Sequence, residues 1–579
     1  MDTETFEPRT VLALVEARLV EAPDAVAVED DAGKLSYEQL WSLATRWADR
    51  LVAGGCGPGS PVAVMLPRGR DQVAIELAAW LTGAAYVPID PSTPAERVRV
   101  VTAKANCALL ARDGGPGHGP TLEPVGTAAR PGPDGYADVA YIVFTSGSTG
   151  EPKGVAVGHA SLANLVAWHL ATYDLGPADR VTAFAGTGFD ASVWEIWSTL
   201  AAGAALVLPL ESDTRDVDSV AEHIAASSTT ACFLSTPLAE RLLRTPNRPT
   251  SLRLLLTGGD RLHIWPDPDF PAAVHNHYGP TEATVVTTAT GDLRRMTQDG
   301  LPPIGRGVGG AELRLVDAAG RTVTAPGEPG ELWIGGVIVA LGYVGPEAGA
   351  DAFVTEAGAG RWYRSGDLCT WDAAGELYFV GRADRQVKLR GQRIELGEIE
   401  QVLCGVPGVS QAAVVVVDRQ GDLELAAFVV GAVGGVPAGH LADRLPAAMV
   451  PRRVETCDAL PLTPNGKIDY AELTRRAAAA EIVPAAWVEQ EYATEVERVI
   501  AGIWARVLGE PTVRRDDDFF VIGGHSMTAS EVVTEVRTTF QIPLHLRVLL
   551  RFPTLHEFSA QIEALVSPAA TAKDEVDNR

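Results

Sequence analysis

Hydrophobic and polar positions follow different periods in different parts of the chain. Up to about residue 380, short apolar runs such as 61–66, 141–144 and 205–209 alternate with amphipathic stretches. Short apolar runs bounded by turn residues are typical of buried strands. Strands that alternate with amphipathic helices indicate an α/β layered fold, so we expect a large α/β domain over residues 1–383.

A smaller segment of mixed character follows the large one. Apolar runs at 412–417 and 425–430 predict two strands, and the segment ends near residue 475. We therefore predict a small α+β domain over residues 384–475. The next stretch is rich in alanine and contains Pro484, which is typical of a linker.

The last part of the chain has the period of helices. Thr494 with Glu497, and Thr554 with Glu557, form capping-box patterns that each precede apolar residues at helical spacing. This pattern predicts an all-α four-helix bundle, followed by a polar, disordered tail. The predicted boundaries are 1–383, 384–475, 476–491 (linker), 492–567 (bundle) and 568–579 (tail).

Composition and charge exclude several classes of function. Of the 579 residues, 46% are hydrophobic and 21% are charged, as in ordinary soluble domains. The 48 Lys and Arg residues against 74 Asp and Glu residues give a formal net charge of −26, which repels phosphate backbones and anionic lipid. No apolar run is long enough for a membrane span, and the N-terminus does not read as a signal peptide. We expect a cytoplasmic protein that binds neither nucleic acid nor membranes.

A loop rich in glycine and hydroxyl groups follows the apolar run 141–144. Residues 145–154 read Thr-Ser-Gly-Ser-Thr-Gly-Glu-Pro-Lys-Gly. Bare backbone N–H groups and hydroxyls can wrap phosphate oxygens, and Lys153 adds a positive charge. The alternative is a flexible linker, but a linker seldom follows a buried strand directly. The GxGxxG pattern at 305–310 differs, because a strand-like run follows it where a dinucleotide-binding turn needs a helix.

Ser526 stands after Gly-Gly-His at the start of a predicted helix of the bundle. A phosphodiester at a helix N-terminus meets free N–H groups and the positive end of the helix dipole. Taken alone, the serine fits an N-cap equally well. A nucleophile elbow would need glycine where this chain has Thr528, which excludes a thioesterase.

Further motifs run through residues 1–475 in one order. They read Leu-Ser-Tyr-Glu-Gln-Leu at 35–40, Gly-Ala-Ala-Tyr-Val-Pro-Ile-Asp at 83–90, Phe-Asp-Ala-Ser-Val-Trp-Glu at 189–195, Asn-His-Tyr-Gly-Pro-Thr-Glu at 276–282, Gly-Glu-Leu at 330–332, Tyr-Arg-Ser-Gly-Asp-Leu at 363–368, Gly-Arg-Ala-Asp at 381–384, Lys-Leu-Arg-Gly at 388–391 and Pro-Asn-Gly-Lys-Ile-Asp at 464–469. With the phosphate loop, this series resembles the adenylation domains of nonribosomal peptide synthetases, in the adenylate-forming (AMP-binding) superfamily. Residues 518–527, Asp-Phe-Phe-Val-Ile-Gly-Gly-His-Ser-Met, resemble a peptidyl carrier domain.

The resemblance implies a reaction in two steps. A carboxylate and ATP form an acyl-adenylate and pyrophosphate, and the acyl group then passes to the thiol of 4′-phosphopantetheine on Ser526. Lys467 would bridge the substrate carboxylate and the α-phosphate, because a cation offsets the repulsion between two anions. Glu282 would hold Mg²⁺ with Thr281 beside the phosphates, and Asp384 would be the hinge of the small domain. The residues implied to bind ATP or AMP are Thr145, Ser146, Gly147, Ser148, Thr149, Gly150, Lys153, Gly259, Asn276, Tyr278, Asp367 and Arg382.

The substrate follows from Asp190, a carboxylate in an apolar run. An unpaired carboxylate is costly to bury, and its partner is either a substrate α-ammonium, as in the family, or a protein Lys or Arg. We expect an α-amino acid. The pocket that the resemblance implies is similar to the family's leucine pockets, with room above Ala191 and Gly258, and predicts leucine, a hydroxylated leucine or another close aliphatic relative. His277 would hydrogen-bond a substrate hydroxyl or support the backbone. The full set is Asp190, Ala191, Trp194, Leu238, Leu256, Gly258, His277, Val285, Val286 and Lys467.

The partners follow from what the motifs lack. The sequence has no condensation, reductase or thioesterase motif, so a separate condensation domain or tailoring enzyme would take the amino acid from Ser526. A phosphopantetheinyl transferase is implied, and an MbtH-like helper protein is a further candidate partner. Two alternatives stay open. One is an acyl-CoA ligase that uses free coenzyme A, and the other is an inactive scaffold that only presents the carrier.

Overall fold

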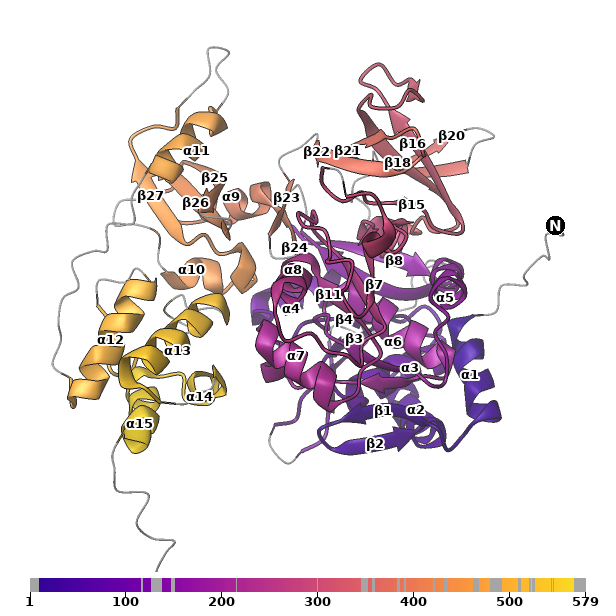
Figure 1. The fold of residues 1–579 in the computed structure, drawn as a ribbon, viewed down its shortest axis with the longest axis horizontal. Coiled ribbons are helices and arrows are strands. Elements are labelled where there is room, and N and C mark those ends of the chain that lie inside the picture. Colours follow the sequence, from indigo (N-terminus) through magenta and orange to yellow (C-terminus); the bar gives the residue numbers. More distant parts are fainter. Residues whose placement is uncertain are drawn as a thin grey trace, which may run out of the picture. The chain divides into compact units, whose positions relative to one another are not determined.

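The computed structural model (Figure 1) divides the described residues into two compact units, within Met1–Leu210 with Ala221–Leu473 and within Glu211–Val220 with Thr474–Arg579. The described residues are 10–115, 118–125, 138–146, 151–214, 216–298, 300–344, 352–356, 360–382, 386–389, 392–419, 422–431, 436, 438–461, 468–479, 492–508, 512–519, 522, 526–542, 544 and 546–566.

A nine-stranded sheet forms one layer of the first unit, and most of its neighbouring strands are parallel. The expected strand at 205–209 is present as β10. In order across the sheet, the strands are β15 (Arg306–Gly307), β14 (Thr288–Ala289), β13 (Ala273–Tyr278), β12 (Leu254–Gly258), β11 (Ala231–Ser235), β9 (Arg180–Ala183), β10 (Ala205–Val207), β1 (Val26–Asp30) and β2 (Gly33–Ser36).

A seven-stranded sheet forms a second layer, and the runs at 61–66 and 141–144 supply β3 and β7 as predicted. Its strands, in order, are β19 (Gly342–Tyr343), β8 (Lys153–Gly158), β7 (Val139–Thr145), β4 (Tyr86–Pro88), β3 (Val62–Met65), β5 (Leu109–Arg112) and β6 (Thr121–Pro124). The helices around the two sheets are α1 (Val11–Glu21), α2 (Tyr37–Ala53), α3 (Arg70–Leu81), α4 (Ala95–Lys104), α5 (His159–Tyr173), α6 (Asp190–Ala202) and α8 (Thr236–Arg244), with the short η2 (Thr281–Ala283). Between α6 and α8 in the sequence lie η1 (Glu211–Thr214) and α7 (Val217–Ala226), of which Glu211–Val220 belongs to the second unit.

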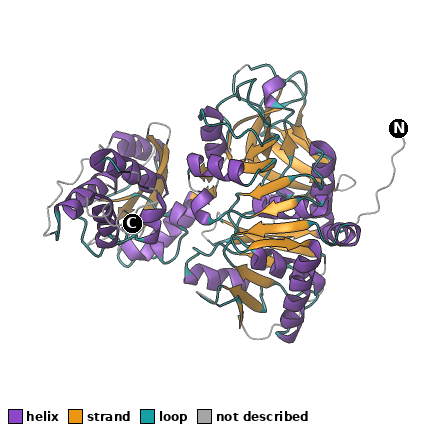
Figure 2. Cartoon of the chain, turned by 60° about the horizontal axis from the view of Figure 1, so that its bottom comes forward, coloured by secondary structure: helices purple, strands orange, loops and turns teal. Residues whose placement is uncertain are grey.

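Two of these helices, α3 and α6, are buried on nearly every side. A helix that is apolar all round belongs in a core, and side chains of both helices join residues of both sheets in one hydrophobic cluster. Trp80 on α3 and Trp197 on α6 meet there with ring centroids 4.1 Å apart, and Trp197 donates to the Tyr86 hydroxyl at 2.8 Å. Figure 2 shows the strands with helices on their flanks. The α/β fold class is confirmed.

A third sheet follows η3 (Leu293–Arg295) and contains the strand predicted after the GxGxxG pattern. That strand is β16, so the pattern opens no helix and the rejection of a dinucleotide-binding turn is confirmed. The order is β17 (Thr322–Val323), β16 (Ala311–Val316), β18 (Gly330–Gly336), β21 (Gly360–Trp371) and β20 (Phe353–Glu356), and β22 (Leu377–Arg382) also pairs with β21.

The small α+β domain has a hairpin and a three-stranded sheet. Arg97 on α4 of the large domain donates to Glu398 on α9 at 2.6 Å, and both side chains are almost fully buried. This ion pair joins the two domains within the first unit. The elements are β23 (Gln386–Leu389), β24 (Gln392–Glu395), α9 (Leu396–Cys404), β25 (Gln411–Arg419), β26 (Asp422–Val430), α10 (Ala438–Ala442), η5 (Ala447–Met449), β27 (Arg453–Cys457) and α11 (Tyr470–Ala479).

The C-terminal helices pack around Trp504, whose ring lies 4.9 Å from that of Phe519 and 6.0 Å from that of Phe558, centroid to centroid. Thr494 accepts a hydrogen bond from the Glu497 amide at 3.1 Å, as an N-cap should, while Glu497 accepts from the Ala493 amide. The predicted helical bundle is present. Its described helices are α12 (Glu495–Leu508), α13 (Ser526–Phe540), α14 (Leu546–Arg551) and α15 (Leu555–Val566).

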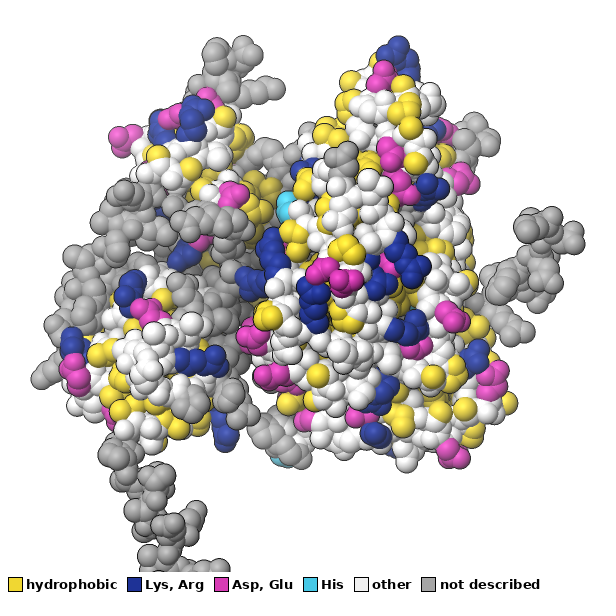
Figure 3. Space-filling model, in the orientation of Figure 1, with side chains coloured by type: hydrophobic (Ala, Val, Ile, Leu, Met, Phe, Trp, Pro, Cys, Tyr) yellow, Lys and Arg dark blue, Asp and Glu magenta, His cyan; other side chains and the backbone are white. Residues whose placement is uncertain are grey.

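On the face seen in Figure 3, Lys and Arg side chains are interspersed with Asp and Glu. Because the chain has a formal net charge of −26, an anionic ligand needs a place where positive charges are concentrated. The first unit has such a concentration of Lys and Arg side chains around its main cavity.

Candidate active site

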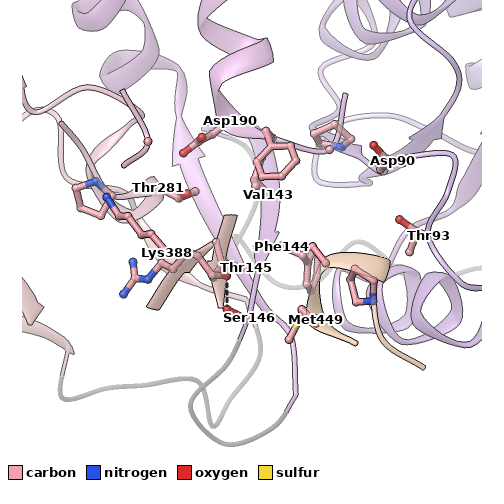
Figure 4. A pocket seen from close by; sticks show the side chains of 18 of the residues that line it. Asp90, Thr93, Val143, Phe144, Thr145, Ser146, Asp190, Thr281, Lys388 and Met449 are labelled. Carbon is pink, nitrogen blue, oxygen red and sulfur yellow. Dashed lines mark hydrogen bonds between the residues drawn. The ribbon is translucent and has the colours of Figure 1, made fainter. Parts of the chain in front are cut away.

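A cavity of about 290 Å³ lies where the carboxyl ends of β7 and β13 face the β23–β24 hairpin. Ligands of open α/β sheets bind at the carboxyl ends of strands. Figure 4 shows Asp190, Thr281 and Lys388 among the side chains that line it. Of the predicted residues, the structure brings together at this cavity Thr145, Ser146, Asp190, Gly259, Tyr278, Thr281, Asp367 and Arg382.

The predicted phosphate loop connects two antiparallel strands. Thr145 ends β7, Lys153 begins β8, and the two residues are paired in register. Ser146 donates to the Arg393 carbonyl at 2.7 Å and accepts from the Glu395 amide at 3.1 Å, so the hairpin engages this hydroxyl. Gly147, Ser148, Thr149 and Gly150 lie outside the described residues, and their phosphate contacts stay predictions.

Of the residues predicted to bind adenine and ribose, three are connected by hydrogen bonds and Asn276 bonds elsewhere. Tyr278 donates to Asp367, and Arg382 donates to the other oxygen of the same carboxylate at 2.6 Å. Asn276 donates its amide to the Pro303 carbonyl at 2.8 Å, which leaves the buried Oδ1 without a partner among the described residues. A buried acceptor of this kind fits a donor such as the exocyclic amine of adenine.

Glu282, the predicted magnesium ligand, is almost completely buried on η2. Tyr343 donates to its Oε1 at 2.7 Å, and Arg393 donates to its Oε2 at 2.9 Å. Within the described part of the chain, no three His, Cys, Asp or Glu side chains gather to hold a metal. A single carboxylate with phosphate oxygens and water suits Mg²⁺, so the donor set fits, provided that Arg393 leaves Glu282.

The hairpin brings two cations that sequence reasoning gave no role. Lys388 lies on β23 with its ammonium 5.2 Å from the centroid of the Tyr278 ring, and Arg393 lies on β24. Burial lowers the pKa of Lys388, while the carboxylates of Asp367 and Asp260 oppose this shift. The sequence signal that could have revealed these two cations is the Lys-Leu-Arg-Gly motif followed by Arg393. This segment concentrates positive charge in an otherwise acidic chain.

Asp190, at the first position of α6, is half-buried and lines the cavity beside Thr281 (Figure 4). Burial raises the pKa of this carboxyl, and a hydrogen bond from the Thr281 side chain opposes the shift. Lys388 contributes only a weaker attraction over a longer range. The carboxylate therefore faces the cavity with a hydroxyl as its side-chain partner.

The predicted substrate pocket is only partly supported by the structure. Trp194, Leu256, Val285 and Val286 share one hydrophobic cluster, with Ala191 packed against it. A side chain at Gly258 would come within 2.5 Å of the His277 carbonyl oxygen. The expected room above Gly258 is therefore absent, because the backbone of the neighbouring strand β13 fills it.

Leu238 is half-buried on α8 and lines neither the main cavity nor a smaller one of about 20 Å³. Phe233 on β11 lines the smaller cavity together with Trp194 and Leu256, and its ring lies 5.6 Å from that of Trp194. Sequence reasoning missed this aromatic residue, because the pocket position was counted from the turn that begins α8.

The turn between Glu282 and the pocket is strained. Thr284 and Val285 have φ angles of 54° and 64°, in the left-handed region that β-branched residues avoid. Gly279 permits the turn, because a side chain there would lie 2.2 Å from the Val285 carbonyl oxygen. Strain of this kind persists only where surrounding contacts hold it, and Thr284 donates to the Ile338 carbonyl at 2.6 Å.

Comparison with known proteins agrees with this geometry. The profile of the family described as AMP-binding enzyme matches residues 15–344, more than half of the chain. The chain belongs to the AMP-binding enzymes. The profiles for the AMP-binding enzyme C-terminal domain and for the phosphopantetheine attachment site match residues 398–467 and 498–562. It is thus an adenylation domain fused to a peptidyl carrier domain, an AMP-forming ligase class that uses ATP, Mg²⁺ and 4′-phosphopantetheine.

Relatives of this AMP-binding enzyme include much longer synthetases. A linear gramicidin synthase protein of Brevibacillus parabrevis is 37% identical over 93% of this chain, and phosphinothricin tripeptide synthetase PhsB of Streptomyces viridochromogenes is 37% identical over 97%. The chain spans 11% of the first and 50% of the second. Among solved structures, holo-PA1221, an NRPS protein with adenylation and PCP domains bound to a vinylsulfonamide inhibitor, superposes with a TM-score of 0.76 at 29% identity, covering 96% of this chain and 97% of that one.

Three predicted residues of the AMP-binding enzyme stay predictions. Lys467 and Asp384 lie outside the described residues, and Ser526 begins α13 although its side chain is not described. Within the described part of the chain, no helix has both the length and the apolar character that a membrane span requires.

Proposed function

We propose that this chain activates an α-amino acid with ATP and transfers it to 4′-phosphopantetheine on Ser526, in the biosynthesis of a nonribosomal peptide or another amino-acid-derived product. The proposal depends on the position of Asp190, whose carboxylate faces the cavity. Among the described residues, its side-chain hydrogen-bond partner is the Thr281 hydroxyl. A substrate α-ammonium there gains an ion pair and compensates a charge that is costly to bury.

In the first step, the chain must bring a carboxylate and a phosphate together. We infer that Asn276 receives the base through its unpartnered Oδ1, that Asp367 receives the ribose, and that Glu282 holds Mg²⁺ when Arg393 has left it. Lys467 would then lie between the two anions and offset their repulsion. Mg²⁺, when bound, would supply charge neutralisation at the phosphates.

In the second step, the thiol must reach the adenylate. Lys388 and Arg393 of the hairpin line the cavity in the structure, and we infer that this orientation of the small domain serves the transfer step. The small domain also adds Met449 to the cavity wall, next to Thr93 and Arg97 of the large domain. We infer that the flexible arm enters where residues of both domains line the cavity.

The side-chain wall supports leucine or a close aliphatic relative as the amino acid. Ala191, Trp194, Leu256, Val285 and Val286 present hydrocarbon, and a hydrophobic pocket distinguishes one methylene by only about 1–3 kcal/mol. The carrier domain requires a phosphopantetheinyl transferase, and the longer relatives support a condensation domain or a tailoring enzyme as the downstream partner. An MbtH-like helper remains a candidate for co-expression trials.

The Ser526→Ala variant separates the two steps. We expect unchanged amino-acid-dependent ATP–pyrophosphate exchange and no mass gain on the carrier domain, because only the attachment point is lost. Intact-mass spectrometry of protein treated with a phosphopantetheinyl transferase, ATP, Mg²⁺ and each common amino acid measures the second quantity. Thr539→Ala, an exposed position on the same helix, is the matched control. Release of acyl-CoA from free coenzyme A would favour the ligase alternative, and absence of any exchange would favour the scaffold.

Asp384→Pro tests the predicted hinge. Proline fixes φ near −65°, so a residue that must change its backbone angles during domain rotation is blocked. We expect exchange to stay near the wild-type rate and thioester formation to slow by about tenfold or more, since only the second step needs the rotation. Quenched-flow loading of the carrier measures this. Equal losses in both assays would argue against a hinge at this position.

A further inference from the structure

His277 belongs to the predicted side-chain pocket and lies on β13, in ring contact with Trp194 of α6. The ring centroids of His277 and Trp194 lie 5.1 Å apart, and only 4% of His277 is exposed. A histidine in such a place is either a recognition group for a polar substrate or part of the wall. The hydrogen bonds of its two nitrogens decide between these roles.

Both nitrogens of His277 have protein partners. Nδ1 lies 3.1 Å from the Thr257 carbonyl oxygen, which can only accept, so Nδ1 carries the proton. Nε2 lies 2.6 Å from the Tyr173 hydroxyl and, being unprotonated, accepts from it. The ring is neutral, because burial and the neighbouring His275 lower the pKa of His277 to about 3.

The other polar atom of the pocket wall is also engaged. The Trp194 indole N–H donates to His169 Nδ1 at 3.1 Å. The Thr257 hydroxyl has no partner among the described residues, but side chains alternate along a strand, so it lies on the opposite face of β12 from Leu256 and Gly258. Apart from Asp190, the described side chains of the predicted pocket set therefore offer a substrate only carbon atoms and engaged polar atoms. Ser198, whose hydroxyl has no partner among the described residues, lines the smaller cavity but is not a member of that set.

We propose that Tyr173, the last residue of α5, is a specificity-determining positioning residue that occupies His277 so that the pocket selects an aliphatic amino acid over an isosteric polar one. The proposal rests on the proposed function and deepens it. Tyr173 lies outside the pocket set that the resemblance supplies. Its hydroxyl is buried, and a neutral, fully bonded histidine contacts a substrate as a hydrocarbon ring would.

The test compares amino acids of nearly equal shape. ATP–pyrophosphate exchange gives kcat/KM for leucine against asparagine and for valine against threonine. In the wild-type protein we expect the aliphatic member of each pair to be preferred by about 100-fold, the discrimination of a hydrophobic pocket against a polar isostere. A preference for the polar member would show that His277 recognises the substrate, and would overturn the proposal while leaving the proposed function intact.

Tyr173→Phe should lower the aliphatic-to-polar ratio by about tenfold or more. The variant leaves His277 Nε2 as a buried acceptor without its donor, and a polar substrate or a water drawn into the pocket then supplies the missing hydrogen bond. The matched control is Tyr37→Phe, which removes an equally buried hydroxyl that donates to the Leu200 and Ala204 carbonyls. This control should leave the ratio unchanged, although both variants lose stability.

A double variant separates specificity from general damage. Tyr173→Phe with His277→Leu removes the Nε2 acceptor that the single variant leaves without its donor, so we expect the aliphatic-to-polar ratio to return to within about threefold of wild type. An unchanged ratio in folded Tyr173→Phe, or a double variant as unselective as the single one, would overturn the proposal. If no amino acid supports exchange in the wild-type protein, the proposed function itself fails, and this proposal with it.

Discussion

Replacing Lys467 with alanine is expected to lower amino-acid-dependent ATP–pyrophosphate exchange by about 10²–10³-fold, the usual cost of one electrostatic contact that forms in the transition state. The lysine would lie between the carboxylate and the α-phosphate. Lys388 and Arg393 are not expected to replace it, because Arg393 is paired with Glu282 and Lys388 lies over the Tyr278 ring. ATP affinity should stay near the wild-type value, because the residues predicted to bind the nucleotide lie in the large domain.

Exchange kinetics and nucleotide titration together measure this effect. Transfer from a synthetic aminoacyl-adenylate to the carrier should persist in Lys467→Ala, since the first step has then been bypassed. Lys34→Ala, an exposed lysine at the surface of the large domain, is the matched control. Normal exchange by Lys467→Ala would remove the lysine from the reaction.

Replacing Arg393 with alanine is expected to slow thioester formation by about 10²-fold while sparing exchange. Arg393 pairs with Glu282 at 2.9 Å, and Glu282 is almost completely buried. Breaking a buried pair by removing one partner costs about 3–5 kcal/mol, because the remaining charge is uncompensated. The loss of this ion pair destabilises only the orientation of the small domain in which the hairpin enters the cavity. The fraction of molecules in this orientation should therefore fall, and the transfer rate should fall with it.

Single-turnover loading of the carrier, beside exchange in the same preparation, measures the split between the two steps. Arg364→Ala provides the control, since Arg364 forms a partly exposed pair with Glu331 at 3.4 Å, and such pairs contribute little. A parallel fall of exchange and transfer in Arg393→Ala would mean that the arginine supports the site as a whole and not one orientation.

Local patterns predicted the architecture well. The strand β7, the strand β16 after the GxGxxG pattern and the N-cap at Thr494 each depend on neighbours in sequence, where period and turn chemistry are sufficient. Several motif-borne site residues also met at one cavity, to which the carboxyl ends of β7 and β13 contribute from two different sheets, whereas Lys153, Asn276 and Glu282 do not line it.

What the sequence did not predict depends on contacts between distant segments. The bond between Tyr173 and His277 spans 104 positions, and the contact between Arg393 and Glu282 spans 111. The absence of a side chain at Gly258 suggested space for a ligand. In the structure, the backbone of β13, which pairs with β12, occupies that space. Such outcomes follow from three-dimensional packing, which no local period encodes.

The left-handed pair Thr284–Val285 limits how this enzyme can be re-engineered. Libraries that vary position 285 to admit new amino acids sample backbone preference and pocket shape together, since most side chains cost about 1–3 kcal/mol in that conformation. Glycine or asparagine would relax the turn and be enriched for stability alone, without any bearing on which substrate is accepted. A variant selected at position 285 should therefore be tested for its folding stability before its enrichment is interpreted as a change in substrate specificity.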